Sequence, residues 1–172
     1  MTWVIVPAIF ALLALFTILV RGGLLRLRDS VRKSWASLDA LLLERHDLMT
    51  RLLDPCARHM RYEADALDRV SRADAAAFAA AAREDIPALA AAEQALRASI
   101  ADLLALAENY PVLCAEPGFL PAKERVLAIG AAVNERRELY NSAVNLLNVR
   151  SQAFPHRMIA RTLGFHAEAL FE

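Results

Sequence analysis

The residues from Trp3 to Val20 contain no charged side chain, and this run limits what the chain can fold into more than any other feature. A helix needs roughly 20 mainly apolar residues to cross about 30 Å of hydrocarbon, and this run is apolar on all sides. The basic n-region and small-residue cleavage site of a secretory signal peptide are missing around it. We therefore expect a single-pass membrane anchor over residues 1–23, with the bilayer contacting residues 3–20, and a separate domain over residues 24–172.

Basic residues follow this run rather than precede it. They are Arg21, Arg26, Arg28, Arg32 and Lys33. Lys and Arg close to a span are retained on the cytoplasmic side of the membrane. The predicted location is the cell membrane, with the N-terminus outside and the C-terminal domain in the cytoplasm.

The composition favours helices and argues against nucleic acid as a partner. The chain is 57% hydrophobic with only 5 Gly, and its many Ala, Leu, Arg and Glu residues lose little entropy in a helix. Lys plus Arg equals Asp plus Glu, at 20 each, so no overall positive field would attract nucleic acid. The 2 cysteines, Cys56 and Cys114, are far apart and are expected to be free thiols.

A seam of mostly apolar residues at alternating steps of four and three predicts a long helix that packs like a coiled coil. This apolar seam consists of Val31, Trp35, Leu38, Leu42, Arg45, Met49, Leu52 and Cys56. The helix is expected to continue past Pro55, with a kink, as far as Val70. Its end has two interpretations: a capping pair formed by Ser71 and Asp74, or a helix start at Asp85.

Two further helices are expected after this one. A helical period leads to Ala107 before Pro111, and another helix runs from about Phe119 to Phe154. Because antiparallel helices in a bundle need comparable lengths, a break near Ser71 is favoured. The fold class is then all-α: an N-terminal transmembrane helix followed by an antiparallel bundle of three long helices and a short C-terminal helix over residues 156–163.

Two expectations concern the positions of segments outside the three long helices. The connection over residues 110–119 should lie level with Trp35 and Asp39, near the membrane. The tail after this short helix, with Phe165, Leu170 and Phe171, is apolar enough to dock on the bundle.

The order of several short motifs from residue 24 to the end resembles the LemA family. These motifs are Leu27-Arg28-Asp29-Ser30-Val31 with Trp35 and Asp39, Arg45-His46-Asp47-Leu48, Ala107-Glu108-Asn109-Tyr110-Pro111, Phe119-Leu120, Tyr140-Asn141-Ser142-Ala143-Val144, Phe154-Pro155 with Ile159-Ala160, Gly164-Phe165 and Phe171-Glu172. The resemblance implies a membrane-anchored antiparallel helical bundle whose biochemical role is undefined. The chain departs from the family at Thr50, where a Pro is usual, and at Gly130-Ala131, where Glu-Asn is usual.

Catalytic and metal-binding patterns are weak. Cys56, His59 and Glu63 stand at helical steps and could share a divalent ion, but the paired Glu-x-x-His motifs of di-metal bundles are missing. Neither cysteine has a local setting that lowers a thiol pKa, and no serine lies in a Gly-x-Ser-x-Gly turn. We expect no enzymatic activity, no metal and no cofactor.

The remaining polar and aromatic residues on the helix faces are the candidate site. They form a possible interaction layer, or a layer that fixes helix register: Trp35, Asp39, Arg45, Asp47, Tyr140 and Asn141, with Asn148 beside them. The expected function is a non-enzymatic, membrane-anchored scaffold that holds a protein partner or copies of itself. The alternatives are an extracytoplasmic sensor or stress module of the envelope and, third, a metal-dependent enzyme.

Overall fold

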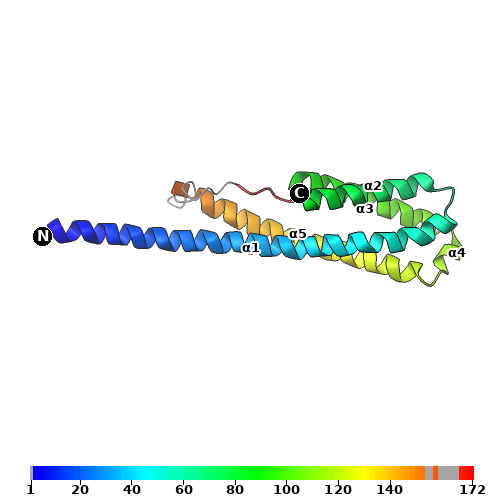
Figure 1. Ribbon diagram of the computed structural model, residues 1–172, viewed down its shortest axis with the longest axis horizontal. Coiled ribbons are helices and arrows are strands. Elements are labelled where there is room, and N and C mark those ends of the chain that lie inside the picture. The colour runs from blue at the N-terminus through cyan, green and yellow to red at the C-terminus, as the bar shows by residue number, and fades with distance from the viewer. Residues whose placement is uncertain (1, 154–156, 159–166) are drawn as a thin grey trace.

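The computed structural model describes residues 2–153, 157–158 and 167–172, without the side chains of residues 2–10 and 13. The described residues form helices and no strand: α1 (Thr2–His59), α2 (Ala64–Ala82), α3 (Ile86–Ala107), α4 (Pro111–Cys114) and α5 (Phe119–Gln152). Helix α1 runs the length of the molecule with α5 antiparallel beside it, and the α2–α3 hairpin covers the half of α1 remote from the N-terminus (Figure 1). The expected all-α antiparallel bundle is confirmed for these residues.

The apolar seam of α1 is the centre of the core. Seven of its eight residues are buried and Trp35 is half-buried, which confirms the spacing argument. The core continues toward the N-terminus through Val20 and Leu24, and α5 faces it with Val126, Ile129, Val133, Val144 and Leu147. Leu120, near the start of α5, is exposed.

Helix α1 continues past Pro55 but ends at His59, so both expected endings of the first helix were wrong. A turn over residues 60–63 follows, and α2 begins at Ala64. Helix α5 begins at Phe119 near this end of α1 (Figure 1), so a longer α1 would have extended its seam beyond the helix that covers it. Reversing the chain here lets Met60 and Ala66 both enter the core.

The Ser71–Asp74 capping pair was also wrong, because Asp74 is a buried residue in the middle of α2. Asp85 does begin a helix: its Oδ1 accepts a hydrogen bond from the Ala88 amide at 3.2 Å. The segment interpreted as one long second helix is therefore two helices joined by a turn over residues 83–85.

This extra reversal changes the direction in which each later helix runs along the bundle. The chain runs away from the N-terminus in α1, back in α2, away again in α3, and back in α5 (Figure 1). The 110–119 connection, which includes α4, consequently lies at the end remote from the N-terminus. Its expected position beside Trp35 and Asp39 was wrong because three long helices were assumed. The α5 bounds were nearly right, ending two residues before the expected Phe154.

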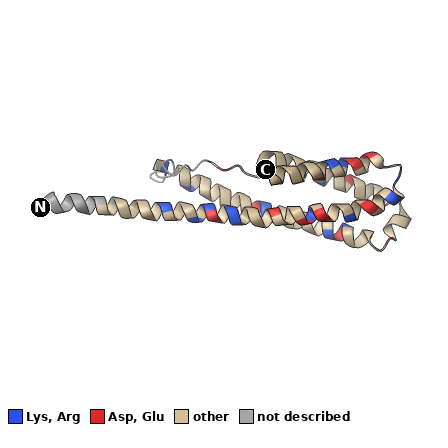
Figure 2. Ribbon diagram, viewed as in Figure 1, with Lys and Arg blue, Asp and Glu red and all other residues tan. Residues whose placement is uncertain are grey.

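Helix α1 continues through residues 23 and 24 without a break. Among the residues whose side chains the structure describes, no helix is long and apolar enough to cross a membrane. Much of the expected anchor, residues 1–10 and 13, lies outside that described set, as does most of the expected short helix over residues 156–163. Along the part of α1 that is not grey, the ribbon in Figure 2 is coloured as charged only from where the helix comes level with the end of α5.

Candidate functional site

A buried ion pair joins α1 to α3 in the middle of the bundle. The Arg45 guanidinium donates to both carboxylate oxygens of Glu93, with Nη1 2.7 Å from Oε2, and both side chains are more than nine-tenths buried. A bidentate pair of this kind fixes the relative height of two helices, at the cost of removing two charges from water. This geometry supports the expected role of Arg45 in setting helix register.

The next residue along α1, His46, contacts α2, the other helix of the hairpin. His46 Nδ1 lies 2.6 Å from Asp74 Oδ2 on α2, and the His46 ring stacks on Phe78 with centroids 4.2 Å apart. Burial raises the pKa of Asp74, and this effect outweighs the opposing attraction of His46 and Arg45. Adjacent residues on α1 therefore bind α3 and α2 separately, which places both helices of the hairpin on one level of α1.

Trp35 and Tyr140 meet nearer the end of the bundle from which the N-terminal part of α1 extends. Their rings pack edge to face with centroids 5.8 Å apart, and the Tyr140 hydroxyl donates to the Ala169 carbonyl at 3.3 Å. Burial, followed by the nearby carboxylates of Glu168 and Glu84, raises the pKa of Tyr140 to about 12. A cavity of about 520 Å³ lies beside the two rings, between α1, the α2–α3 turn and the C-terminal segment.

Asn141 and Asn148 on α5 hold the last residues of the chain. Asn141 accepts from the Phe171 amide at 2.8 Å and donates to the Phe171 carbonyl at 2.9 Å. Asn148 makes the same two bonds to Glu168, at 3.0 and 2.9 Å. Phe171 is buried, which confirms the expected docking for this residue, whereas Leu170 remains partly exposed and Phe165 lies outside the described residues.

The remaining two candidate residues do not join these contacts. Asp39 and Asp47 are exposed on α1, and neither makes a hydrogen bond or ion pair with any residue in the described part of the chain. The six candidates are thus divided into three groups. Arg45 forms the ion pair, Trp35 packs on Tyr140 while Tyr140 and Asn141 bind the tail, and Asp39 and Asp47 face solvent.

The candidate metal ligands are separated at the far end of the bundle. Helix α1 ends at His59, so Glu63 is not on the same helical face; His59 Nε2 lies 2.8 Å from Glu116, and Glu63 accepts from the Tyr110 hydroxyl at 3.3 Å. Burial raises the pKa of the Cys56 thiol to about 11. In the described ranges, no three His, Cys, Asp or Glu side chains are grouped to hold a metal ion.

Comparison of the sequence with known protein families assigns the chain to a family. The model of the LemA family matches residues 34–172, which is most of the chain. The chain belongs to the LemA family. A search of the curated proteins found no match.

The structure brings LemA-like motifs that are far apart in this sequence into contact. The Tyr140-Asn141 motif of α5 binds the backbone of Ala169 and of Phe171, which belongs to the terminal motif, and the Arg45-His46 motif binds the α2–α3 hairpin. The departure at Gly130-Ala131 lies beside a cleft of about 300 Å³ between α3 and α5. A Cβ added at Gly130 would meet no atom within 4 Å, so this glycine is not required by packing.

The partners Glu93 and Asp74 were missed as functional candidates, although the sequence contains a signal for each. Glu93 occupies an apolar position of α3 between Leu89 and Leu96, as Arg45 does on α1. Asp74 lies in step with Val70 and Ala77 on the buried face of α2. A charged residue at a buried helical position requires a partner of opposite charge, and that rule could have linked Glu93 to Arg45.

Proposed function

We propose that this LemA-family chain is a non-enzymatic scaffold, anchored in a membrane by the start of α1, that holds a protein partner at the cytoplasmic face. Helix α1 belongs both to the anchor and to the bundle without a break. At 1.5 Å per residue, its 58 residues extend roughly 87 Å. A partner bound to the bundle would therefore have a fixed distance and orientation relative to the membrane.

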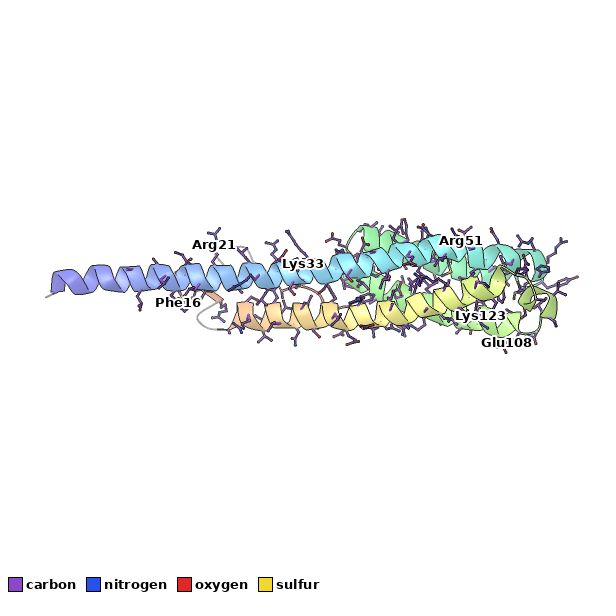
Figure 3. The ribbon with its side chains drawn as sticks, turned by 90° about the horizontal axis from the view of Figure 1, so that it is seen from below. Phe16, Arg21, Lys33, Arg51, Glu108 and Lys123 are labelled. Atoms are coloured by element: carbon purple, nitrogen blue, oxygen red, sulfur yellow. The ribbon has the colours of Figure 1, made fainter. Side chains whose placement is uncertain are left out.

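The observation that supports the anchor best is the apolar surface of α1 beyond the bundle. Four large side chains there are 56–72% exposed: Leu12, Leu15, Ile18 and Leu19. Figure 3 shows that the part of α1 around Phe16 and Arg21 lies beyond the α2–α3 hairpin. Water is a poor solvent for a continuous apolar helix surface, and the uncharged sequence before it extends this surface toward the N-terminus.

The scaffold interpretation is supported by how the buried polar groups are used. Arg45 and Glu93 line the cleft between α3 and α5, but their charged groups bind each other across helices, as those of His46 and Asp74 do, and so hold helices together. The raised pKa of Cys56 keeps this thiol protonated near neutral pH, and a thiol is a poor nucleophile.

Membrane fractionation tests the anchor. In the Leu12→Arg/Leu15→Arg variant, two charges interrupt the apolar run, and each costs about 2.5–3.5 kcal/mol at the centre of a span. We expect the wild-type chain to stay in the membrane after an alkaline wash and this variant to become soluble. The matched control is Leu139→Arg/Leu146→Arg, which changes two leucines of α5 that are both 48% exposed.

The control variant should remain in the membrane because its substitutions lie in the bundle. If the Leu12/Leu15 variant stays as firmly attached as wild type, the start of α1 is not the anchor and the proposal is wrong. Release of both variants would point to general misfolding, which circular dichroism of the purified chains would detect as lost helix.

A further inference from the structure

We propose that the α5 face formed by Arg137, Tyr140, Asn141 and Asn148 is a docking site for an extended peptide of a partner protein, and that the chain's own residues 167–172 occupy it when no partner is bound. This inference rests on the scaffold function proposed above and names its contact surface. The tail already present on the face shows which chemistry fits there.

The face binds mainly peptide backbone. Asn141 and Asn148 lie seven residues apart, two turns along one side of α5, and each pairs its amide with both the N–H and the carbonyl of one tail residue. The residues so paired, Glu168 and Phe171, are three apart and run antiparallel to α5. Tyr140 adds a donor to the Ala169 carbonyl between them. Backbone hydrogen bonds of this kind accept almost any sequence in an extended conformation.

One side chain supplies the selectivity. Phe171 is 1% exposed, and the Arg137 guanidinium lies over its ring, 6.0 Å from the centroid. The other tail side chains, from Ala167 to Leu170 and at Glu172, are exposed. The fitting ligand is therefore an extended peptide in which an aromatic residue stands three positions after the residue that binds Asn148.

The tail can be replaced because the cost of ordering it offsets much of what its contacts contribute. Six residues must be ordered, and the backbone entropy lost at each is about as large as the net contribution of one hydrogen bond. In return, the tail makes five hydrogen bonds to α5 and buries one side chain fully. Released tail and docked tail are therefore close in free energy, and a partner peptide of the same pattern competes with the docked tail. Competition by the chain's own tail lowers the apparent affinity for such a partner.

The test uses the full chain in detergent micelles and a fluorescein-labelled acetylated peptide, Ala-Glu-Ala-Leu-Phe-Glu, which copies residues 167–172. Binding is followed by fluorescence anisotropy. We expect the Phe171→Ala chain, whose tail has lost its anchor, to bind the peptide at least about tenfold more tightly than the wild-type chain. A second chain that ends at Ala167 should behave like Phe171→Ala, and it keeps the test valid if one of the two variants folds poorly.

Matched controls distinguish binding at this site from non-specific peptide binding. Adding Asn141→Ala to Phe171→Ala should weaken peptide binding by at least about tenfold, whereas adding Asn145→Ala, an exposed residue one turn away on α5, should leave it unchanged. A peptide with Ala in the fifth position should not bind. The proposal is overturned if neither opened chain binds the peptide, or if Asn141→Ala and Asn145→Ala have equal effects.

Size measurement addresses a second copy as the occupant. If wild-type chains form dimers that dissociate when the peptide is added, the face holds the tail of a second copy and the partner-peptide proposal is wrong. Loss of peptide binding would leave membrane attachment unaffected, so failure of this proposal and failure of the proposed function give different results.

Discussion

At the residue scale, the two charged pairs of α1 differ in what burial does to them. The Arg45–Glu93 pair is bidentate and lies deep between α1 and α3. In the His46–Asp74 pair, His46 remains partly exposed and burial dominates the pKa of Asp74. The first pair should therefore be costly to break, while the second should be costly to keep ionised.

Breaking the Arg45–Glu93 pair should leave a buried charge without a partner. We expect Glu93→Leu to lower the free energy of unfolding by about 3–5 kcal/mol, and Arg45→Met/Glu93→Leu to recover most of that loss. The control is Arg125→Ala, which removes an exposed ion pair with Glu44 and should cost less than about 1 kcal/mol. Chemical denaturation measures all three, and a double variant as unstable as Glu93→Leu would contradict the argument.

The raised pKa of Asp74 has a definite sign for stability. A carboxyl whose folded pKa exceeds its unfolded value contributes stability below the unfolded pKa, and this contribution is lost as pH rises through the folded pKa. Asp74→Asn removes this titration. We expect the variant to have a higher Tm than wild type near pH 7, with the difference disappearing below pH 3.8, the ordinary pKa of an Asp carboxyl.

The measurement is a pair of thermal melts across that pH range, and the comparison between the two chains cancels the titration of other groups. A Tm of Asp74→Asn below that of wild type at pH 7 would show that the contact with His46 outweighs burial.

At the element scale, the turn between α2 and α3 decides the topology of the bundle. Glu84 adopts a left-handed conformation with φ of 52°, the Glu84 amide donates to the Ala81 carbonyl at 2.9 Å, and the Asp85 amide donates to the Ala80 carbonyl at 3.0 Å. This bond pattern is the Schellman motif, in which glycine is the usual left-handed residue. The turn is therefore made by its hydrogen bonds, with a residue that does not favour its backbone conformation.

We expect Glu84→Gly to raise the free energy of unfolding by about 1 kcal/mol, because glycine adopts a positive φ without steric cost. Arg83→Gly, one residue earlier at φ of −97°, is the matched control and should lower it by roughly 0.5–1 kcal/mol. Denaturation curves of the two variants measure both changes in the free energy of unfolding. Equal effects of the two substitutions would mean that the left-handed conformation is not under strain.

At the scale of the whole molecule, the proposed membrane anchor gives α1 a direction, and that direction would decide which compartment contains the bundle. The five basic residues from Arg21 to Lys33 follow the apolar run. A fluorescent protein fused after Glu172, of a kind that is active only in the cytoplasm, should therefore be active in cells, because nearby basic residues resist translocation.

Replacing these five residues by Gln should reduce that activity and increase the activity of an alkaline phosphatase fusion, which works only outside the cytoplasm. The matched control replaces five basic residues of the bundle by Gln: Arg51, Arg61, Arg69, Arg83 and Lys123. A wild-type chain active only as the phosphatase fusion would favour the extracytoplasmic envelope module.

The sequence by itself determined the helical class, the buried seam of α1 and, to within two residues, the bounds of α5. Each depends on a local period that repeats over many residues, such as the steps from Val31 to Cys56. The resemblance to the LemA family was also recognised without any structure, and the family match over residues 34–172 confirms the family. Local patterns are sufficient here because a helix is defined by contacts between residues three and four apart.

Only the tertiary structure decided where α1 ends, how many times the chain reverses and which residues meet. Ser71 and Asp74 have the local chemistry of a cap, yet Asp74 pairs with His46, because a partner 28 residues away was available. Likewise, nothing near Asn141 indicates that it binds Phe171. These outcomes depend on which helix covers which surface, and that choice is made by burial and pairing between segments far apart in the chain, which no local period records.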